Sequence, residues 1–273
     1  MSDLAAGKRT LVEAVVAPRA GGPTRSSTCA RPRPIVSVVI PTLNEALCLP
    51  RAIASAASPD VEILVVDGGS SDGTVALAED LGALVVHAPR GRGSQLAAGA
   101  DAAHGDLLLF LHADALLPPG YVQSVRCAMA DPRCAIGAFR LRIGARGLGL
   151  RLVEWGARLR SRWLAMPYGD QGFFVRASTY REIGGFSTLP AMEDLEFLRR
   201  IRRLGSVRTL SSGVVVSPRS WQRHGVLRFT LWNVVCAVAF LLGVSPARLA
   251  RLRARCVDRC RTGRRACPRS QML

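Results

Sequence analysis

Three polar clusters each follow a short apolar run of the sequence: Pro41–Glu45, Asp67–Asp72 and His112–Asp114. If the apolar runs are parallel strands, the clusters lie together at one edge of a sheet, where open parallel sheets bind ligands. The Asp67 carboxylate can accept hydrogen bonds from a base or a ribose. Asp114 can bind Mg²⁺, which proteins often hold with one or two carboxylates and the phosphates of a substrate. Taken alone, Asp67 could equally be a helix cap, and Asp114 a turn former.

The segments around these clusters predict strands that alternate with helices. This alternation is typical of an α/β fold whose parallel sheet is covered on both faces. Strands are predicted at residues 35–40, at the start of 61–74, at 83–87 and at 106–114. Helices are predicted from Asn44 to Ala57, from an N-cap at Ser71 or Asp72, from Ser94 to His104 and from Pro119 to Ala130.

The pattern changes after residue 130. Residues 135–143 alternate in polarity and predict an edge or antiparallel strand, and residues 147–165 can form an Arg-rich amphipathic helix. A loop at 167–178 leads into a further strand, and a helix at 189–204 opens with Met192-Glu193-Asp194. We therefore expect a mixed C-terminal half that completes one sheet, and not a separate domain.

The formal net charge of +17 is concentrated at the two ends of the chain. Residues 35–245 carry 22 Lys/Arg against 17 Asp/Glu, so a basic surface for nucleic acid is not expected there. We expect a disordered basic leader at 1–34, a folded domain at 35–225, an apolar helical segment at 226–255 and an Arg/Cys-rich tail at 256–273.

Residues 229–244 contain no charged side chain. A membrane-spanning helix needs about 20 apolar residues, so this stretch is short for that role. Arg228 before it and several arginines after it fit a helix that lies on anionic lipid. A core helix packed on the sheet and a spanning helix are the alternatives.

Taken together, VSVVIPTLNE, EILVVDGGSSDGT and DLLLFLHADALLPPG resemble the nucleotide-sugar-binding half of family 2 glycosyltransferases with the GT-A fold. GDQGFFVR, the GGF at 184–186 and MEDLEFLRRIRRLG continue the likeness, which covers about residues 35–225. The likeness is closest to a small bacterial branch, which includes enzymes associated with radical-SAM/selenodomain genes and glycosyltransferases of carotenoid acids. It implies a GT-A-type, Rossmann-like, mostly parallel sheet flanked by helices.

The resemblance also implies roles for the matching residues. The nucleotide-sugar-binding residues would be Pro41, Thr42, Asn44, Glu45, Asp67, Gly69, Arg92, Gln95 and Ala113. Asp114 corresponds to the last acid of the family's Asp-x-Asp motif, which binds Mg²⁺ or Mn²⁺, whereas His112 replaces the first acid. His224 is a candidate additional metal ligand, although a lone histidine near a helix start is more often structural. The acceptor side would comprise Gly169, Asp170, Gln171, Trp221 and Arg223.

Sugar transfer from a nucleoside diphosphate needs charge stabilisation on the leaving group and a base for the acceptor hydroxyl. The resemblance implies Asp194, beside Glu193, as that base, and a single displacement would invert the anomeric centre. Acids in the first turn of a helix also complement the helix dipole, so this pair alone would not identify a base.

These features predict a metal-dependent inverting glycosyltransferase that uses a UDP- or GDP-linked sugar. The acceptor would be a hydroxyl or carboxyl group on a lipid-linked or isoprenoid-type molecule, at the cytoplasmic face of the cell membrane. One alternative is a nucleotidyltransferase, which would usually carry a Gly-rich phosphate loop after its first strand. Another is a nucleotide-sugar-binding protein with weakened catalysis, because His112 replaces the first acid of the Asp-x-Asp motif.

Overall fold

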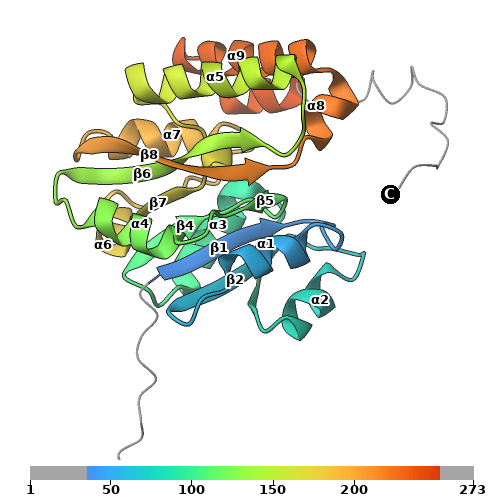
Figure 1. Ribbon diagram of the computed structural model, residues 1–273, viewed down its shortest axis with the longest axis vertical. Coiled ribbons are helices and arrows are strands. Elements are labelled where there is room, and N and C mark those ends of the chain that lie inside the picture. The colour runs from blue at the N-terminus through green and yellow to red at the C-terminus, as the bar shows by residue number, and fades with distance from the viewer. Residues whose placement is uncertain (1–35, 253–273) are drawn as a thin grey trace, which may run out of the picture. The chain divides into compact units, whose positions relative to one another are not determined.

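An eight-stranded mixed sheet organises residues 36–252, the part of the chain that this computed structural model describes (Figure 1). Its strand order is β3-β2-β1-β4-β7-β6-β8-β5. The strands are β1 (Val36–Thr42), β2 (Val61–Asp67), β3 (Leu84–His87), β4 (Leu107–Phe110), β5 (Ala115–Leu116), β6 (Cys134–Ile143), β7 (Phe173–Arg176) and β8 (Ser206–Val216). The predicted leader at 1–34 and tail at 256–273 lie outside the described residues.

Strands β3, β2, β1 and β4 are parallel neighbours. The register pairs Thr42 of β1 with Asp67 of β2, so the carboxyl ends of these strands meet at one edge. Successive residues of β1 enter opposite cores: Val38 and Ile40 pack on one face of the sheet and Val39 on the other. Burial on both faces explains the near-continuous apolar runs, and the predicted α/β fold is confirmed.

β7 joins this parallel half to the rest of the sheet, because it is antiparallel to both β4 and β6. β6 is parallel to β8, which is antiparallel to the short strand β5. The mixed C-terminal half is thus confirmed. The sequence pattern of β6 left open an edge strand or an antiparallel strand. β6 is an interior strand, so the edge alternative was wrong. Its Gly137 lies against the Phe174 ring, since a Cβ there would be 2.1 Å from that ring.

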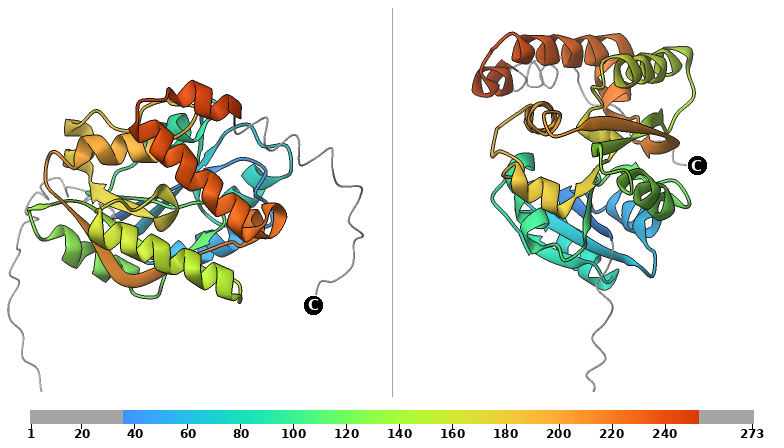
Figure 2. Two further views of the ribbon diagram at one scale, coloured as in Figure 1. Left: turned by 90° about the horizontal axis from the view of Figure 1, so that it is seen from above. Right: turned by 90° about the vertical axis from the view of Figure 1, so that its left-hand side faces the viewer.

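Helices cover both faces of the sheet (Figures 1 and 2). One core packs the strands against α1 (Leu49–Ala56), α2 (Thr74–Asp80), α4 (Tyr121–Met129) and α5 (Leu148–Trp163). The other core contains α3 (Arg92–Ala102), α6 (Ala177–Glu182) and α7 (Glu193–Ile201). A short 3-10 helix, η1 (Gly169–Gln171), precedes β7.

Several predicted boundaries were wrong. β4 ends at Phe110 instead of residue 114, and α1 begins at Leu49 instead of Asn44. α7 covers Glu193–Ile201 instead of 189–204, and the N-cap of α2 is Gly73 instead of Ser71 or Asp72. Leu111 and Ala113 stay buried beyond the end of β4, so the apolar pattern continues past the strand. Asn44 has a φ of 56°, which lies outside the right-handed helical region and excludes it from α1.

Helices α8 (Arg219–His224) and α9 (Val226–Leu241) follow β8. α9 contacts α5, and the two helices form an outer layer beyond β6 (Figure 2). Within α9 only Cys236 and Ala237 are fully buried, whereas Leu227 is 81% exposed. Across residues 36–252, no helix has both the length and the apolar character needed to cross a membrane. The exposed apolar side chains distinguish α9 from an ordinary core helix.

Helix α3 approaches β1 and β2 closely at Gly99, where a Cβ would lie 2.4 Å from Val39 Cγ1 and 2.6 Å from Val66 Cγ2. Gly99→Ala should lower the free energy of unfolding by about 1–3 kcal/mol through overpacking, despite the better helix propensity of alanine. Gly156→Ala is the matched control, because a Cβ on Gly156 in α5 meets nothing within 4 Å. The control should raise the free energy of unfolding by about 0.5–1 kcal/mol. Urea denaturation measures both, and equal stabilisation by the two substitutions would contradict this packing of α3.

Candidate active site

The loops that follow β1 and β2 are joined to each other by hydrogen bonds. The Asn44 N–H donates to Ser70 Oγ (2.9 Å), and the Asn44 side-chain oxygen accepts from the Ser71 N–H (2.8 Å). The next N–H along the chain, that of Glu45, donates to Thr74 Oγ1 (3.0 Å). These bonds fix the two predicted nucleotide-binding loops relative to each other at the carboxyl edge of the sheet.

Asp67 and Gln95 use their side chains to build this edge. Asp67 is 3% exposed and accepts the N–H groups of Gly69 (2.9 Å) and Ser70 (3.0 Å). Burial acts to raise the pKa of Asp67, but the hydrogen bonds from Ser70 and Gly69 outweigh it and lower the pKa. The Gln95 side-chain amide donates to the Thr42 carbonyl oxygen (2.7 Å) and so ties α3 to the end of β1.

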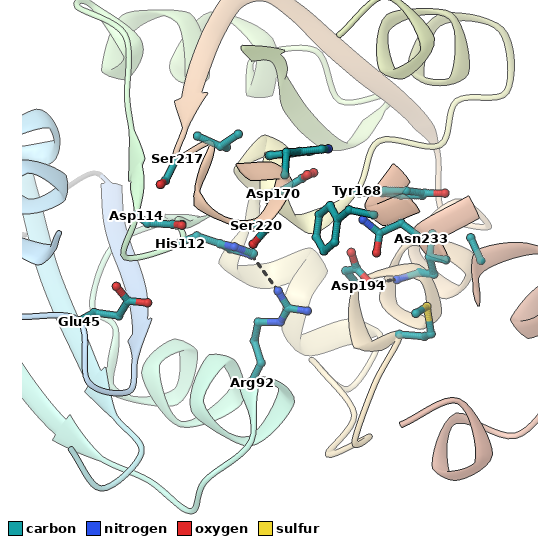
Figure 3. A pocket seen from close by; sticks show the side chains of 16 residues that line it. Glu45, Arg92, His112, Asp114, Tyr168, Asp170, Asp194, Ser217, Ser220 and Asn233 are labelled. Atoms are coloured by element: carbon teal, nitrogen blue, oxygen red, sulfur yellow. Dashed lines mark hydrogen bonds between the residues drawn. The ribbon is translucent and has the colours of Figure 1, made fainter. Parts of the chain in front are cut away.

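A cavity of about 320 Å³ opens beside this edge (Figure 3). It is bordered by the loops after β1 and β4, by η1 and by residues of α3, α7, α8 and α9. Its lining residues are Glu45, Arg92, His112, Asp114, Tyr168, Asp170, Met192, Asp194, Leu195, Val216, Ser217, Ser220, Trp221, Phe229, Asn233 and Ala237. The other predicted donor-side residues do not line it: Pro41, Thr42, Asn44, Asp67, Gly69, Gln95 and Ala113.

Arg92 is held between an acid and a histidine. Its Nε pairs with the carboxylate of Glu193, which is 2% exposed, and its NH1 lies 3.2 Å from His112 Nε2 (Figure 3). Because a guanidinium can only donate, Nε2 accepts, and the imidazole is neutral with its proton on Nδ1. Burial and the positive charge of Arg92 lower the pKa of His112 to about 4. The predicted catalytic partner Glu193 is thus an orienting ion-pair partner of Arg92.

Arg219 joins the two remaining acids on this side of the cavity. Its NH2 group donates to both oxygens of Glu45 (3.2 and 2.9 Å) and to Asp114 Oδ2 (3.1 Å). The sequence prediction missed Arg219 and selected Arg223, one helical turn further along α8. Arg223 is exposed and does not line the cavity. Arg219 and Glu45 are 174 residues apart, so no local pattern connects them.

Two further carboxylates line the cavity, on η1 and α7 (Figure 3). Asp194 Oδ2 accepts the Gly169 N–H (2.8 Å) and Oδ1 accepts the Leu195 N–H (2.9 Å). Asp170 Oδ1 is buried and has no hydrogen-bond partner within residues 36–252. Gln171 is 1% exposed and points away from the cavity lining, since its amide bonds to the Phe139 carbonyl oxygen (2.9 Å).

Helices α8 and α9 close the remaining wall with aromatic and amide side chains. Trp221 lines the cavity, donates to Thr230 Oγ1 (3.2 Å) and packs edge-on against Phe229, with ring centroids 5.4 Å apart. His224, the candidate extra metal ligand, stacks on the Phe229 ring, with ring centroids 6.0 Å apart. His224 is not among the residues that line the cavity. Asn233 was missed by the sequence prediction, although an amide within an apolar run was the available signal.

The sequence profile described as "Glycosyl transferase family 2" matches residues 37–189, more than half of the chain. The chain belongs to glycosyl transferase family 2. The match includes the edge at Asp67, the cavity residue Asp114 and the η1 residue Asp170. Asp194 and Arg219 lie beyond it.

Curated relatives match this family 2 chain over parts of their length. Validoxylamine A glucosyltransferase of Streptomyces hygroscopicus subsp. jinggangensis is 37% identical over 118 residues, or 36% of this chain and 26% of that protein. Undecaprenyl-phosphate 4-deoxy-4-formamido-L-arabinose transferase of Proteus mirabilis is 25% identical over 236 residues, or 78% of this chain and 69% of that protein. The chain spans only 26–36% of the length of the first curated relatives that it matches.

Among solved structures, the mannosyltransferase PcManGT from Pyrobaculum calidifontis, in complex with GDP-Man and Mn²⁺, aligns with a TM-score of 0.58. The alignment covers 86% of this chain and 77% of that chain at 17% identity. At this identity the likeness concerns the fold alone. It confirms the GT-A-type fold that the sequence motifs predicted.

Asp114 is the residue of this family 2 chain that best fits a divalent cation. Its carboxylate and that of Glu45 share the guanidinium of Arg219, so a positive charge is already held between them. Residues 36–252 contain no group of three or more His, Cys, Asp or Glu side chains that could hold a metal ion. A Mg²⁺ or Mn²⁺ ion on Asp114 would therefore need the phosphates of a donor as further ligands, as is usual for Mg²⁺.

Arg219→Gln should tighten the binding of Mn²⁺ to the donor-free protein several-fold. The substitution removes the guanidinium that competes for Asp114 and leaves the two acids uncompensated. Electron paramagnetic resonance of free Mn²⁺ measures the dissociation constant. Arg203→Gln is the matched control, because it changes the net charge equally at an exposed position. Equal affinity in the two variants would show that Arg219 does not compete with a cation for Asp114.

Proposed function

We propose that this chain is an inverting glycosyltransferase, which moves a sugar from a nucleoside-diphosphate donor to a hydroxyl or carboxyl acceptor. The observation that carries the proposal is the arrangement of the cavity, with Glu45 and Asp114 toward one end, Asp194 toward the other, and Arg92 and Asp170 between them (Figure 3). One end suits a diphosphate with a cation, and the other end suits an incoming nucleophile. Family 2 membership supports a donor of this class.

We also propose membership of the small bacterial branch associated with radical-SAM/selenodomain genes and carotenoid-acid glycosyltransferases. The segments GDQGFFVR and MEDLEFLRRIRRLG support this narrower assignment. The first of them carries the acceptor-side residue Asp170 and the second carries Asp194.

On the donor side, the joined loops at Asn44 and Asp67 would bind the base and ribose of a UDP- or GDP-linked sugar. Arg92 and Arg219 would provide positive charge for the diphosphate, and charge-assisted hydrogen bonds from arginine to phosphate are strong. A bound Mg²⁺ or Mn²⁺ would supply further stabilisation of the leaving group. Arg219 would have to exchange its acids for phosphate oxygens when the donor enters.

On the acceptor side, the nucleophilic oxygen would attack the anomeric carbon opposite the diphosphate. The new carbon–oxygen bond forms while the bond to the phosphate oxygen breaks, and the nucleoside diphosphate leaves with the electron pair. A carboxylate of the Asp170/Asp194 pair would receive the proton of the nucleophile. Trp221 and Phe229 form an apolar wall beside this pair, which supports a lipophilic acceptor.

A donor panel tests this proposal. UDP-glucose, UDP-N-acetylglucosamine and GDP-mannose are each added with Mn²⁺ or Mg²⁺. The melting temperature is measured, and so is the release of nucleoside diphosphate when farnesol is present as the sugar acceptor. One donor should raise the melting temperature by mass action and be consumed. Asp114→Ala should remove the metal-dependent part of this shift, whereas Asp80→Ala, an exposed control on α2, should not.

Other outcomes of the panel would contradict glycosyl transfer. Binding of a donor without release of nucleoside diphosphate would favour a nucleotide-sugar-binding protein. This alternative is considered because His112 replaces an acid of the metal-binding motif. Release of pyrophosphate from UTP or GTP in the presence of a sugar phosphate would favour a nucleotidyltransferase. If no donor binds and no nucleoside diphosphate is released, glycosyl transfer and nucleotide-sugar binding are both refuted.

We further propose that α5 and α9 rest on the cytoplasmic surface of the cell membrane, where the acceptor is embedded. α9 lines the cavity with Phe229, Asn233 and Ala237, while its opposite side is exposed and apolar. The exposed apolar side chains of the two helices are Leu148, Leu152, Trp155, Trp163, Leu227, Leu231, Val234, Val235, Val238 and Leu241. Exposed arginines on the same helices, including Arg158, Arg162 and Arg228, suit anionic lipid. The substrate in the name of the P. mirabilis relative, an undecaprenyl phosphate, supports a lipid-linked acceptor by analogy.

The double substitution Leu227→Gln/Leu231→Gln should weaken binding to vesicles of phosphatidylcholine and phosphatidylglycerol, measured by flotation. The two side chains are 81% and 58% exposed, so their replacement removes apolar contact without opening the core. Leu81→Gln/Leu84→Gln is the matched control, at exposures of 45% and 47% just after α2 and at the start of β3. Both variants keep the basic ends of the chain. Equal flotation of the two would contradict docking through α9.

A further inference from the structure

Helix α9 presents one carboxamide to the cavity. The residues of α9 that line the cavity are Phe229, Asn233 and Ala237, which are four residues apart and so share one face of the helix. Residues 229–244 contain no charged side chain, and Asn233 is the one carboxamide among them. The family profile ends at residue 189, so the family match does not assign a role to this face of α9.

The Asn233 amide has no structural use within residues 36–252. Asn233 is half-buried, and its side chain makes no hydrogen bond to the described residues. Neither its amide nitrogen nor its oxygen is buried without a partner, so both atoms are open to the cavity. Asparagine also has a low helix propensity, so local preference does not explain its place in α9. The amide is therefore available to a ligand.

Asp194 lies toward the same end of the cavity as Asn233 (Figure 3). Each of its oxygens accepts one backbone N–H, from Gly169 (2.8 Å) and from Leu195 (2.9 Å), and each keeps a further lone pair. A hydroxyl group can donate its proton to such a carboxylate while its oxygen accepts a hydrogen bond from the Asn233 amide. The two side chains together match the donor and the acceptor of one hydroxyl group.

The acids on the acceptor side are not neutralised by an ion pair. Asp170 and Asp194 line the cavity, and neither forms an ion pair within residues 36–252. Arg160 attracts both of them, but its guanidinium lies over the Tyr168 ring, 3.2 Å from the centroid, and donates to Gln171 Oε1 (3.3 Å). A phosphate or a carboxylate on the acceptor would add another negative charge here, whereas an alcohol would not.

The other two arginines at the cavity are also engaged. Arg92 pairs with the buried carboxylate of Glu193, and Arg219 pairs with Glu45 and Asp114. Under the proposed function, both guanidinium groups turn to the diphosphate of the donor. An anionic acceptor would then have to compete with the donor for the same cations.

Apolar side chains surround the amide. Phe229 and Ala237 lie one turn on either side of Asn233, and Trp221 packs edge-on against Phe229. Leu195 of α7 also lines the cavity. A wall of this kind suits a hydrocarbon chain, and a charge beside it would lose solvation. An alcohol on an apolar chain fits both the amide and the wall.

We propose that Asn233 is a specificity-determining residue, which holds the acceptor hydroxyl and selects an uncharged lipophilic alcohol over a phosphate or a carboxylate. The inference rests on the proposed function and narrows its acceptor. The Asn233 amide donates to the hydroxyl oxygen, and the O–H donates to Asp194. The oxygen then bonds to the anomeric carbon, its proton passes to Asp194, and the nucleoside diphosphate leaves with the electron pair of the broken carbon–oxygen bond.

Three acceptors with one hydrocarbon chain test the selection: farnesol, farnesyl phosphate and farnesoic acid, each with Mn²⁺ and the donor that wild type consumes. Wild type should use farnesol with a kcat/KM about 10-fold or more above the other two. Asn233→Ala should lower kcat/KM for farnesol by about 10-fold, as for one lost hydrogen bond, and leave the KM of the donor unchanged. Gln222→Ala removes an exposed carboxamide of α8 and is the matched control, with wild-type values expected.

Two further variants separate the hydrogen bond from the shape of the side chain. Asn233→Asp keeps the shape, removes the N–H donor and adds a negative charge, so it should lower kcat/KM for farnesol more than Asn233→Ala does. Asn233→Gln keeps the N–H donor and should recover part of the loss. A higher kcat/KM for Asn233→Asp than for Asn233→Gln would contradict the proposed hydrogen bond.

The melting temperature gives a measurement that does not depend on turnover. The Asn233 amide makes no hydrogen bond to the described residues, and alanine is the better helix former, so Asn233→Ala should keep or raise the melting temperature. A residue that holds α9 in place would lower it. A lower melting temperature, with an equal loss of kcat/KM for all three acceptors, would show a structural role and overturn the inference.

The remaining outcomes separate this inference from the proposed function. If wild type prefers farnesyl phosphate or farnesoic acid, or if Asn233→Ala keeps the kcat/KM for farnesol, the inference is overturned. If the donor is consumed but none of the three acceptors is glycosylated, the inference fails while use of the donor still supports the proposed function. If no donor binds or is consumed, the proposed function itself fails.

Discussion

Acidic side chains crowd around one small cavity, and the structure depends on how their mutual repulsion is offset. Like charges in a partly buried site raise each other's free energy unless cations or hydrogen-bond donors compensate them. Arg219 forms ion pairs with Glu45 and Asp114, and Arg92 forms an ion pair with Glu193. Two backbone N–H groups donate hydrogen bonds to the Asp194 carboxylate. These pairings fix where α3, α7 and α8 meet the sheet edge.

The mixed sheet explains why these acids meet at all. The parallel half brings the ends of β1, β2 and β4 to one edge, and that edge provides Glu45 and Asp114. Because β7 runs antiparallel to β4, its first residue lies beside the end of β4, and η1 just before it delivers Asp170 to the same edge. Reversal of one strand direction therefore brings the Asp170 carboxylate into the same cavity as Glu45 and Asp114. α9 then closes the cavity from outside the sheet.

Much of the fold could be predicted from the sequence because local patterns encode it. The apolar runs at 36–40 and 107–110 identify buried parallel strands, since burial on both faces leaves no polar alternation. The acids at strand ends identified the edge, and the family motifs identified Asp114, Asp170 and Asp194 as members of one site. The boundary errors arose where tertiary contacts override local pattern, as at Asn44, whose loop is held by Ser70 and Ser71.

The parts of the site that could not be predicted are those that depend on pairing between distant segments. Arg219 and Arg223 look equivalent in the sequence, one turn apart on α8, and only the fold brings one of them to Glu45. Glu193 and Asp194 also look equivalent, yet one is paired with an arginine and the other with backbone donors. Residue type identifies the acids that could act as a base, whereas the partner of each acid is set by contacts that only the fold brings about.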